Sequence, residues 1–454
     1  MLKQSRNFKE SVNVKFSKMH LPAIWATPVA FIFSCTFAFP QDTSTFRNDL
    51  SHSGIYAGGT AQFHDVKWKF KTHGEVNSSP AIVDGVVFIG SNDGNLYAID
   101  QNTGSRKWAF TTNSRVPSSP AIAGGVVYFG SYDGYFYAID AATGKLKWKF
   151  ATPGERRYAG THLHGSVPLG ETMPDPFDVY LSSPAVWNGT VYFGSGDGNI
   201  YALDAAAGTL KWKFKTGDVV HASPAIADGK LFVGSWDSYF YSIDALTGKE
   251  LWRFKTGEDN DIHNQVGIQS SATVSEDTVY FGCRDSNFYA LDAATGHQRW
   301  VFNNKGSWVI TSPIVQGVRV YSATSDTATL HILDASNGAH IDSLKFKWPF
   351  FASPSIAGGV LYLAGQDGKL VATDLSTRKK LWTFQSDGSV ENLAKLSMPD
   401  GGPNYEAVFA SNFYDDLIVG VSSIHRVGMF LSSPVISGKV VYIGSTDGNL
   451  YALE

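Results

Sequence analysis

The chain has 454 residues and a formal net charge of −4, and no basic run follows residue 20. This charge balance argues against nucleic acid as a partner. The 45 glycines and an aromatic content of 14% are typical of a protein with many short strands and tight turns.

Residues 1–40 have the composition of an export signal or a membrane anchor. A basic segment precedes the apolar stretch 21–39, and polar sequence begins at Gln41, which is the order of a secretory signal. Retention as a single membrane anchor is the alternative, because about eighteen apolar residues just span a bilayer. Lipidation at Cys35 is a third interpretation, weakened by the bulky Phe33. In each case we expect export of residues 41–454 to the periplasm or the outer face of the cell envelope.

Eight copies of one repeat fill the chain from Ser78 onward. Every copy has a proline, or alanine in the fifth copy, followed thirteen positions later by an aspartate. These pairs are Pro80 and Asp93, Pro120 and Asp133, Pro184 and Asp197, Pro224 and Asp237, Ala272 and Asp285, Pro313 and Asp326, Pro354 and Asp367, and Pro434 and Asp447. A fixed period of this length indicates a repeat architecture.

Each copy has the pattern of four short strands. In the first copy these are 81–83, 86–91, 95–100 and 105–110, separated by Asp-Gly and Thr-Gly turns. About forty residues in four antiparallel strands is the size of a propeller blade. Segment 66–70 resembles an outer strand without inner ones, and the eighth copy lacks an outer strand. The sequence therefore predicts an all-β fold over residues 41–454: an eight-bladed β-propeller of four-stranded antiparallel blades, closed by N- and C-terminal strands that share one blade.

The outer strands carry a recognisable motif. Ala138-Ile139-Asp140 with Gly144 and Trp148 resembles the tryptophan-docking motif of the quinoprotein (PQQ-binding-like) propellers, in which the tryptophan packs against the neighbouring blade. The motif recurs around Trp108, Trp212, Trp252, Trp300 and Trp382. The sixth copy has Ile332 in place of alanine and no tryptophan after Gly338, and the seventh has Arg378 in place of glycine. We expect these two blades to be irregular.

Three connections between blades are enlarged, and all fall on the same end of the predicted ring: link one (151–181), link two (255–269) and link three (385–431). Long loops on a compact fold usually carry function. In link three, the apolar runs 406–410 and 417–421 predict a hairpin.

Candidate ligand-binding residues lie on this end of the ring. Tyr132, Trp236 and Arg284 each precede a repeat aspartate, and His221 lies in a link. An aromatic platform with a guanidinium group suits a flat anionic ligand such as PQQ. Ordinary packing between blades is the competing and favoured interpretation. His162 and His164, with Glu171 or Asp175, are candidate metal ligands, against the simpler interpretation of loop histidines without metal.

The resemblance implies two functions. One is a non-enzymatic envelope propeller, similar to the lipoprotein propeller of the outer-membrane β-barrel assembly machine, that binds a protein partner or a small ligand on the end with the long links. It would attach to a membrane, if at all, through residues 1–40. The other is a PQQ-dependent dehydrogenase that oxidises an alcohol or sugar with PQQ and calcium. The alcohol-oxidising branch typically has a vicinal cysteine pair, whereas Cys35 and Cys283 are far apart, so the non-enzymatic function is favoured.

Overall fold

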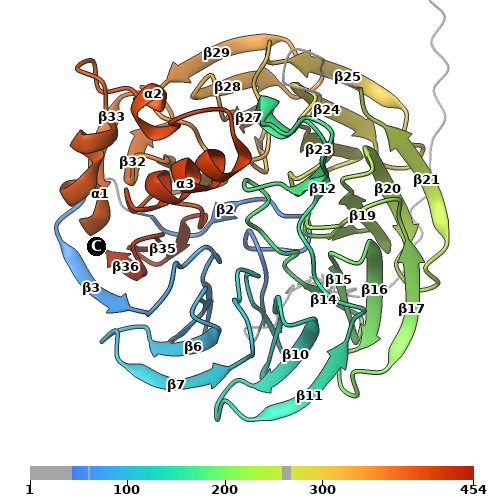
Figure 1. The fold of residues 1–454 in the computed structure, drawn as a ribbon. Coiled ribbons are helices and arrows are strands. Elements are labelled where there is room, and N and C mark those ends of the chain that lie inside the picture. The colour runs from blue at the N-terminus through green and yellow to red at the C-terminus, as the bar shows by residue number, and fades with distance from the viewer. Residues whose placement is uncertain (1–42, 60–61, 258–266) are drawn as a thin grey trace, which may run out of the picture. The chain divides into compact units, whose positions relative to one another are not determined.

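The computed structural model describes residues 43–59, 62–257 and 267–454. These residues form eight four-stranded antiparallel blades around a central axis (Figure 1), which confirms the predicted fold. Residues 1–40, with the predicted export signal or anchor, lie outside the described part of the chain. Within the described part, no helix is both long and apolar enough to cross a membrane.

The strands of each blade follow one another from the axis outward. For blades one to seven they are β4 (Ala81–Val83), β5 (Val86–Gly90), β6 (Asn95–Asp100) and β7 (Arg106–Thr111); β8 (Ala121–Ala123), β9 (Val126–Gly130), β10 (Tyr135–Asp140) and β11 (Leu146–Ala151); β14 (Ala185–Trp187), β15 (Thr190–Gly194), β16 (Asn199–Asp204) and β17 (Leu210–Lys215); β18 (Ala225–Ala227), β19 (Lys230–Gly234), β20 (Tyr239–Asp244) and β21 (Glu250–Lys255); β22 (Thr273–Ser275), β23 (Thr278–Gly282), β24 (Asn287–Asp292) and β25 (Gln298–Asn303); β26 (Ile314–Gln316), β27 (Arg319–Ala323), β28 (Thr329–Asp334) and β29 (His340–Lys345); β30 (Ser355–Ala357), β31 (Val360–Ala364), β32 (Lys369–Asp374) and β33 (Lys380–Gln385).

Blade eight joins the two ends of the propeller. Its inner strands are β34 (Val435–Ser437), β35 (Val440–Gly444) and β36 (Asn449–Leu453), and its outer strand is β3 (Val66–Lys71). The β3 strand pairs antiparallel with β36 and places Trp68 opposite Ala452. The predicted closure by both ends is therefore confirmed, and it removes two exposed sheet edges.

The repeat aspartate organises the turn that it begins. In blade one, Asp93 accepts hydrogen bonds from the backbone N–H of Asn95 at 3.0 Å and from the Tyr97 hydroxyl at 2.7 Å. It also accepts one from the backbone N–H of His73, in the link from the preceding blade, at 3.0 Å. In blade one the aspartate therefore ties a turn to its own strand and to the neighbouring link, which is a structural reason for its recurrence in the repeat.

The outer-strand tryptophans hold consecutive blades together. The Trp108 indole N–H donates to the carbonyl of Ala141 in the next blade at 3.0 Å, and its ring covers Gly144. A Cβ on Gly144 would lie 2.7 Å from the indole, so only glycine fits beneath the ring. The same pairs recur as Trp68 with Gly104, Trp148 with Gly208, Trp212 with Gly248, Trp252 with Gly296, and Trp300 with Gly338.

Blades six and seven keep the common four-stranded pairing, and the expected irregularity is confined to the turn between β27 and β28 of blade six, which has five residues where the other blades have four. At their junction, Asp342 occupies the tryptophan position opposite Ile332, and Arg378 occupies the glycine position with a φ of 59°. The two side chains form an ion pair. A polar pair therefore replaces the tryptophan–glycine pair at this junction, and the strand pairing is preserved.

Residues 43–59 close one end of the axis. The strand β1 (Thr43–Ser44) pairs with β8, and β2 (Ile55–Tyr56) runs parallel to β30 on the far side of the ring. Between them, the buried Arg47 donates to the carbonyls of Pro313 at 2.7 Å and Pro354 at 3.0 Å. Burial lowers the pKa of Arg47 to about 10. We call residues 43–59 the strap, because they contact blades on opposite sides of the ring (Figure 1).

Link three is helical, so the predicted hairpin is wrong. It contains α1 (Asp387–Asn392), the 3-10 helix η2 (Leu393–Leu396), α2 (Tyr405–Val408) and α3 (Tyr414–His425). The buried residues of α3 are Leu417, Gly420, Val421 and Ile424, which is helical and not strand spacing. Asp415 and Asp416 in the first turn favour the helix through its dipole.

Links one and three meet across the other end of the axis and form a structure that we call the cap. Link one contributes β12 (Ala159–Gly160), the 3-10 helix η1 (Leu163–Gly165) and β13 (Met173–Pro174). The Tyr414 hydroxyl donates to the Pro174 carbonyl at 2.5 Å. An apolar core joins the cap to the ring and includes Val179, Val408, Ile424 and Met429 of the cap and Trp308 and Phe351 from short links of the ring. Both ends of the axis are therefore covered.

Candidate functional site

The axis between strap and cap is narrow and polar. In each blade, the serine that precedes the proline column lies on the axis. Among the described residues, the backbone N–H of this serine donates to the hydroxyl of the equivalent serine in the next blade in seven cases, at 2.8 to 3.2 Å. The remaining cavity is about 40 Å³, with Phe46 of the strap and Tyr180 of the cap among its lining residues. Ligand pockets usually have roughly 300–1,000 Å³, so the axis itself has no space for a cofactor-sized molecule.

The four predicted ligand-binding residues lie beneath link one. Arg284 and Trp236 are in contact, as their adjacent blades require, with the guanidinium carbon 4.4 Å from the indole centroid. Arg284 forms an ion pair with Asp175 of link one at 2.6 Å and donates twice to Gln269, at 2.7 and 3.0 Å. Burial raises the pKa of Asp175, but Arg284 and then His164 outweigh burial and hold that pKa well below its usual range.

His221 and Tyr132 lie beside this pair of residues. The buried His221 donates from Nδ1 to the Asp178 carboxylate of link one at 2.8 Å, and Glu155 lies 3.9 Å from its other ring nitrogen. Burial lowers the pKa of His221, but the two carboxylates outweigh burial and raise it to about 9. The rings of Tyr132 and His221 lie edge to face, with their centroids 6.5 Å apart. The structure thus brings the predicted residues into one neighbourhood that fastens link one to the ring.

This neighbourhood does not fit a flat cofactor such as PQQ. Tyr158 of link one stacks on Trp236 with centroids 4.4 Å apart and an interplanar angle of 11°. Arg284 lies between the rings of Trp236 and Trp308. The aromatic platform and the guanidinium group are therefore in contact with the protein's own side chains. Ligand binding by Tyr132, His221, Trp236 and Arg284 stays a prediction.

The two candidate metal ligands differ in their surroundings. His164 lies 3.3 Å from Asp175 and contacts Phe177 and Trp308 edge-on, whereas His162 is exposed. Across residues 43–59, 62–257 and 267–454, no three His, Cys, Asp or Glu side chains come together as a metal site would require. Metal binding by this pair also stays a prediction.

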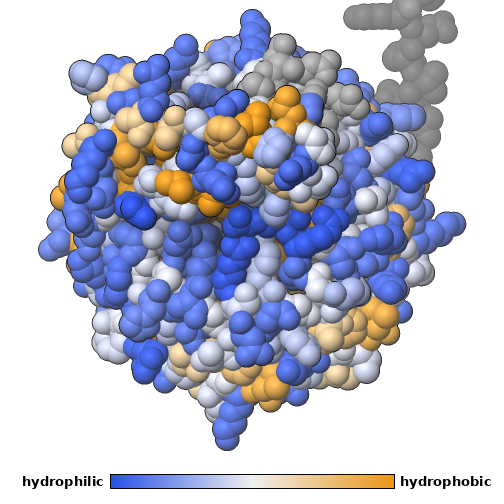
Figure 2. Space-filling view, viewed as in Figure 1, coloured by the Kyte–Doolittle hydropathy of each residue, from blue (hydrophilic) through white to orange (hydrophobic). Residues whose placement is uncertain are grey.

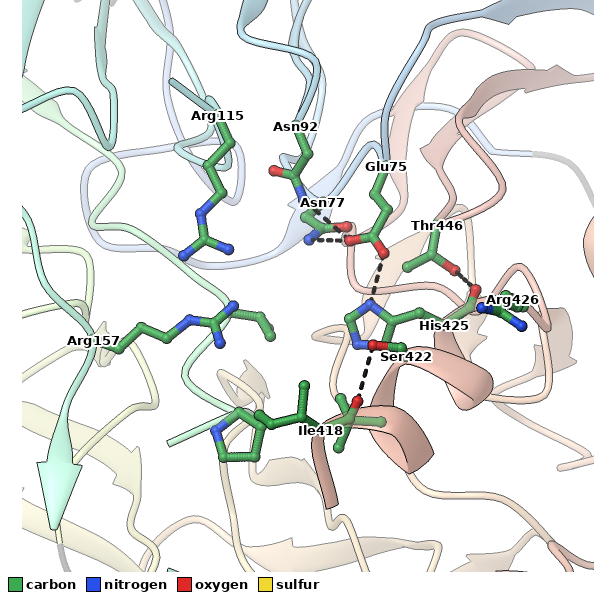
Figure 3. Close-up of a pocket in the computed structure, with 13 residues that line it drawn as sticks. Glu75, Asn77, Asn92, Arg115, Arg157, Ile418, Ser422, His425, Arg426 and Thr446 are labelled. Carbon is green, nitrogen blue, oxygen red and sulfur yellow. Dashed lines mark hydrogen bonds and ion pairs between the residues drawn. The ribbon is translucent and has the colours of Figure 1, made fainter. Parts of the chain in front are cut away.

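An open pocket of about 440 Å³ lies between the cap and blades eight, one and two. Its walls are the short links of blades one and two, link one, and α3 (Figure 3). The lining residues are Glu75, Asn77, Asn92, Arg115, Arg157, Pro176, Val179, Ile418, Val421, Ser422, His425, Arg426 and Thr446. Its volume lies within the usual range for ligand sites, and we call it the cap pocket.

The charges of the cap pocket are unevenly paired. On one wall, Glu75 accepts hydrogen bonds from Asn92 at 3.1 Å and Asn77 at 3.3 Å and lies 2.8 Å from His425. Burial raises the pKa of Glu75, but these bonds outweigh burial and lower it. On the facing wall, the Arg115 and Arg157 guanidinium groups point toward each other (Figure 3). One wall of the cap pocket therefore carries a carboxylate whose hydrogen bonds are satisfied, and the facing wall carries two cations.

Sequence reasoning did not find Arg115 or Arg157. Arg115 occupies the column before the buried valine of a short link, where other copies have Glu75 and Val219. A comparison of the short links would have marked this column as variable. No repeat column contains Arg157, because link one has no counterpart in the other blades.

Exposed apolar side chains gather on the cap. Val390, Phe413 and Val419 of link three have exposed fractions of 71%, 60% and 62%. Figure 2 shows apolar side chains over α3 and strongly hydrophilic ones in the hollow beside it. The end of the ring that carries links one and three is therefore a mixed surface with an apolar part and a polar hollow.

Three comparisons place the chain among known proteins. A family model described as outer membrane protein assembly factor BamB matches residues 64–168, 172–304 and 289–454. No curated protein matches the chain. The solved structure of BamB from Moraxella catarrhalis has a TM-score of 0.62 at 14% identity, covering 86% of this chain and 99% of that one.

Quinoprotein enzymes are similar in fold as well. The quinohemoprotein alcohol dehydrogenase from Comamonas testosteroni has a TM-score of 0.67 at 14% identity, covering 91% of this chain and 80% of that one. A europium-containing methanol dehydrogenase has a TM-score of 0.64 at 14% identity, covering 91% and 98%. At these identities the likeness to solved structures concerns the fold alone.

Proposed function

Because the chain belongs to the family of the outer membrane protein assembly factor BamB, we propose that it is a non-enzymatic β-propeller of the cell envelope that binds a partner protein through the cap. The family membership and the predicted export of residues 41–454 support an envelope location. The family model is described as an outer membrane protein assembly factor, and a role in protein assembly is proposed here by that relationship.

The observation that carries this proposal is the exposed apolar surface of the cap. Val390, Phe413 and Val419 lie in a segment that no other blade connection contains, and they face solvent while the cap core beneath them is filled. Exposed apolar patches often mark interaction sites, and these three side chains all belong to link three. At the opposite end of the ring the strap covers the axis, and the blades present short turns that are nearly the same in every copy, which offer little basis for specificity.

Site-specific photo-crosslinking tests the proposal. A photoreactive residue at position 419 should capture a defined protein from the envelope fraction, and the same residue at position 318 should not. Val318 is the matched control, because it is 72% exposed and lies in the turn after β26 on the opposite end. The captured species should disappear with Phe413→Asp and persist with Val318→Asp. Equal capture from both positions would contradict the assignment of the partner to the cap.

A PQQ-dependent dehydrogenase is the alternative, supported by the fold of the two dehydrogenases. The contacts of Tyr158 and Arg284 with Trp236 weigh against it. Incubation with PQQ and calcium, followed by dye-linked oxidation of alcohols and sugars, decides between the two. Quinone-dependent turnover would overturn the non-enzymatic proposal.

A further inference from the structure

We propose that Arg115 and Arg157 form a clamp for the carboxylate of an acidic side chain in an extended segment of the partner protein. This inference rests on the proposed function, because it names the chemistry by which the cap would recognise its partner. The site is the cap pocket, and the recognised element is an acidic residue next to an apolar one.

The two arginines face each other without a carboxylate between them. Within the described residues, neither forms an ion pair, although Arg156, the neighbour of Arg157, is paired with Asp218 at 2.7 Å. Arg115 lies over the ring of Tyr132 at 3.8 Å, which fixes its direction. Burial, and then the charge of Arg157, lower the pKa of Arg115. Two partly buried guanidinium groups that repel each other are an arrangement that a bound anion would stabilise.

The carboxylates near the clamp are already engaged. Glu75 on the facing wall is held by His425, Asn77 and Asn92. Asp178 interacts with Arg115 through its charge. It already accepts one hydrogen bond from the backbone N–H of Tyr158 and one from His221. The third arginine of the pocket, Arg426, points away from the clamp in Figure 3. The positive charge of Arg115 and Arg157 is therefore available to an incoming anion.

Unpartnered polar atoms in the same pocket point to a peptide and not to a simple anion. Among the described side chains, Asn77 Oδ1 and Asn92 Oδ1 are buried acceptors without a hydrogen-bond donor, and Arg157 Nε is a buried donor without an acceptor. Asn77 is only 3% exposed. Leaving such atoms unpaired costs free energy. A peptide supplies both complements, since its carboxylate accepts from arginine and its backbone N–H groups donate to the asparagines.

The apolar lining residues of the cap pocket indicate which kind of partner side chain would lie next to the bound carboxylate. Pro176 and Val179 from link one and Ile418 and Val421 from α3 give the pocket apolar walls between the clamp and the helix. The exposed Val419 continues this surface onto the outside of α3. An acidic residue in the clamp would therefore place an adjacent leucine-sized side chain against the apolar wall.

The test uses the full chain and fluorescent, end-capped octapeptides with a central Glu-Leu pair or the isosteric Gln-Leu pair. End-capping leaves the glutamate as the carboxylate that distinguishes the two sets. We expect fluorescence anisotropy to show at least tenfold tighter binding of the best Glu-Leu peptide than of its Gln-Leu counterpart, because charged hydrogen bonds are the strong ones. Arg115→Gln and Arg157→Gln should each abolish this difference, and Arg156→Gln should preserve it.

Thermal melting separates recognition from folding. Arg157→Gln removes repulsion and no ion pair, so its melting temperature should equal or exceed that of the wild type. Equal binding of the two peptide sets, or tight binding that survives Arg115→Gln and Arg157→Gln, would overturn the clamp. Acetate or phosphate alone that binds as tightly as the peptides would also overturn it, because these anions have no N–H groups for the asparagines. If crosslinking at position 419 succeeds while the clamp variants bind normally, the proposed function stands and the clamp fails.

Discussion

The junction of blades six and seven offers a direct test of how the propeller is held together. At six other junctions a tryptophan covers a glycine of the next blade, but here Asp342 pairs with Arg378. The double variant Asp342→Trp with Arg378→Gly should rebuild the common pair at this junction. Its indole N–H would meet the carbonyl of Leu375, the counterpart of Ala141 beneath Trp108. We expect the double variant to be more stable than either single variant and than the wild type.

The magnitudes follow from the contacts. Arg378→Gly loses a half-exposed ion pair, worth ~0.2–1 kcal/mol, but it also relieves a positive φ that costs a side chain roughly 1–2 kcal/mol, so its net effect should be near zero. Asp342→Trp alone should destabilise by ~1–3 kcal/mol, because a Cβ at the glycine position lies only 2.5 to 2.7 Å from the indole at the six other junctions. The double variant should gain about 2 kcal/mol from indole burial and its hydrogen bond.

A double-mutant cycle in urea, followed by far-ultraviolet circular dichroism, measures this coupling. We expect a coupling free energy of roughly 3–5 kcal/mol in the stabilising direction, because the gain of the double variant adds to the cost of Asp342→Trp alone. The reverse exchange at the preceding junction is the matched control: Trp300→Asp should be partly rescued by Gly338→Arg. Additive effects, with a coupling free energy below about 0.5 kcal/mol, would refute the view that the two pairs are equivalent solutions for one junction.

Two further predictions concern the buried charges. Burial lowers the pKa of His221, but Asp178 and Glu155 raise it, and the net result is a rise from 6.5 to about 9. The protonated ring therefore stabilises the fold fully below pH 6.5. This stabilisation is lost as the pH rises through about 9. The difference in unfolding free energy between wild type and His221→Gln should shrink by up to ~3 kcal/mol over this range, and a difference that does not change with pH would contradict the assignment. Arg47→Met should lower the unfolding free energy by about 3 kcal/mol, because it leaves the carbonyls of Pro313 and Pro354 without their donor, and the exposed Arg106→Met is the control that should change little.

The fold was predictable because the information is repeated eight times. The register of proline, aspartate and tryptophan fixed the blades, and the lack of an outer strand in the eighth copy fixed the closure. The repeat also placed Trp236 and Arg284 in equal columns of adjacent blades, where the structure brings them into contact. It did not predict their partners Tyr158 and Asp175, which come from link one, a segment with no second copy to compare.

The cap pocket depends on contacts that no local pattern specifies. Arg157 reaches Arg115 only because link one folds back over the preceding blade, and α3 completes the wall from the far end of the chain. The error on α3 has a local cause. The apolar run 417–421 is too short to separate a strand from a helix, and the decisive residue, Ile424, lies one turn beyond it.

The strand β3 has a consequence for the order of events during synthesis. It leaves the ribosome about 380 residues before its partner β36, which at ~5–20 residues per second is a wait of roughly 20–80 s. For that time its edge has no native partner, and an unpaired strand is a template for aggregation. Its sequence alternates Lys67, Lys69 and Lys71 with Trp68 and Phe70. The same lysines that face solvent in the finished ring would keep the waiting strand from pairing with another chain.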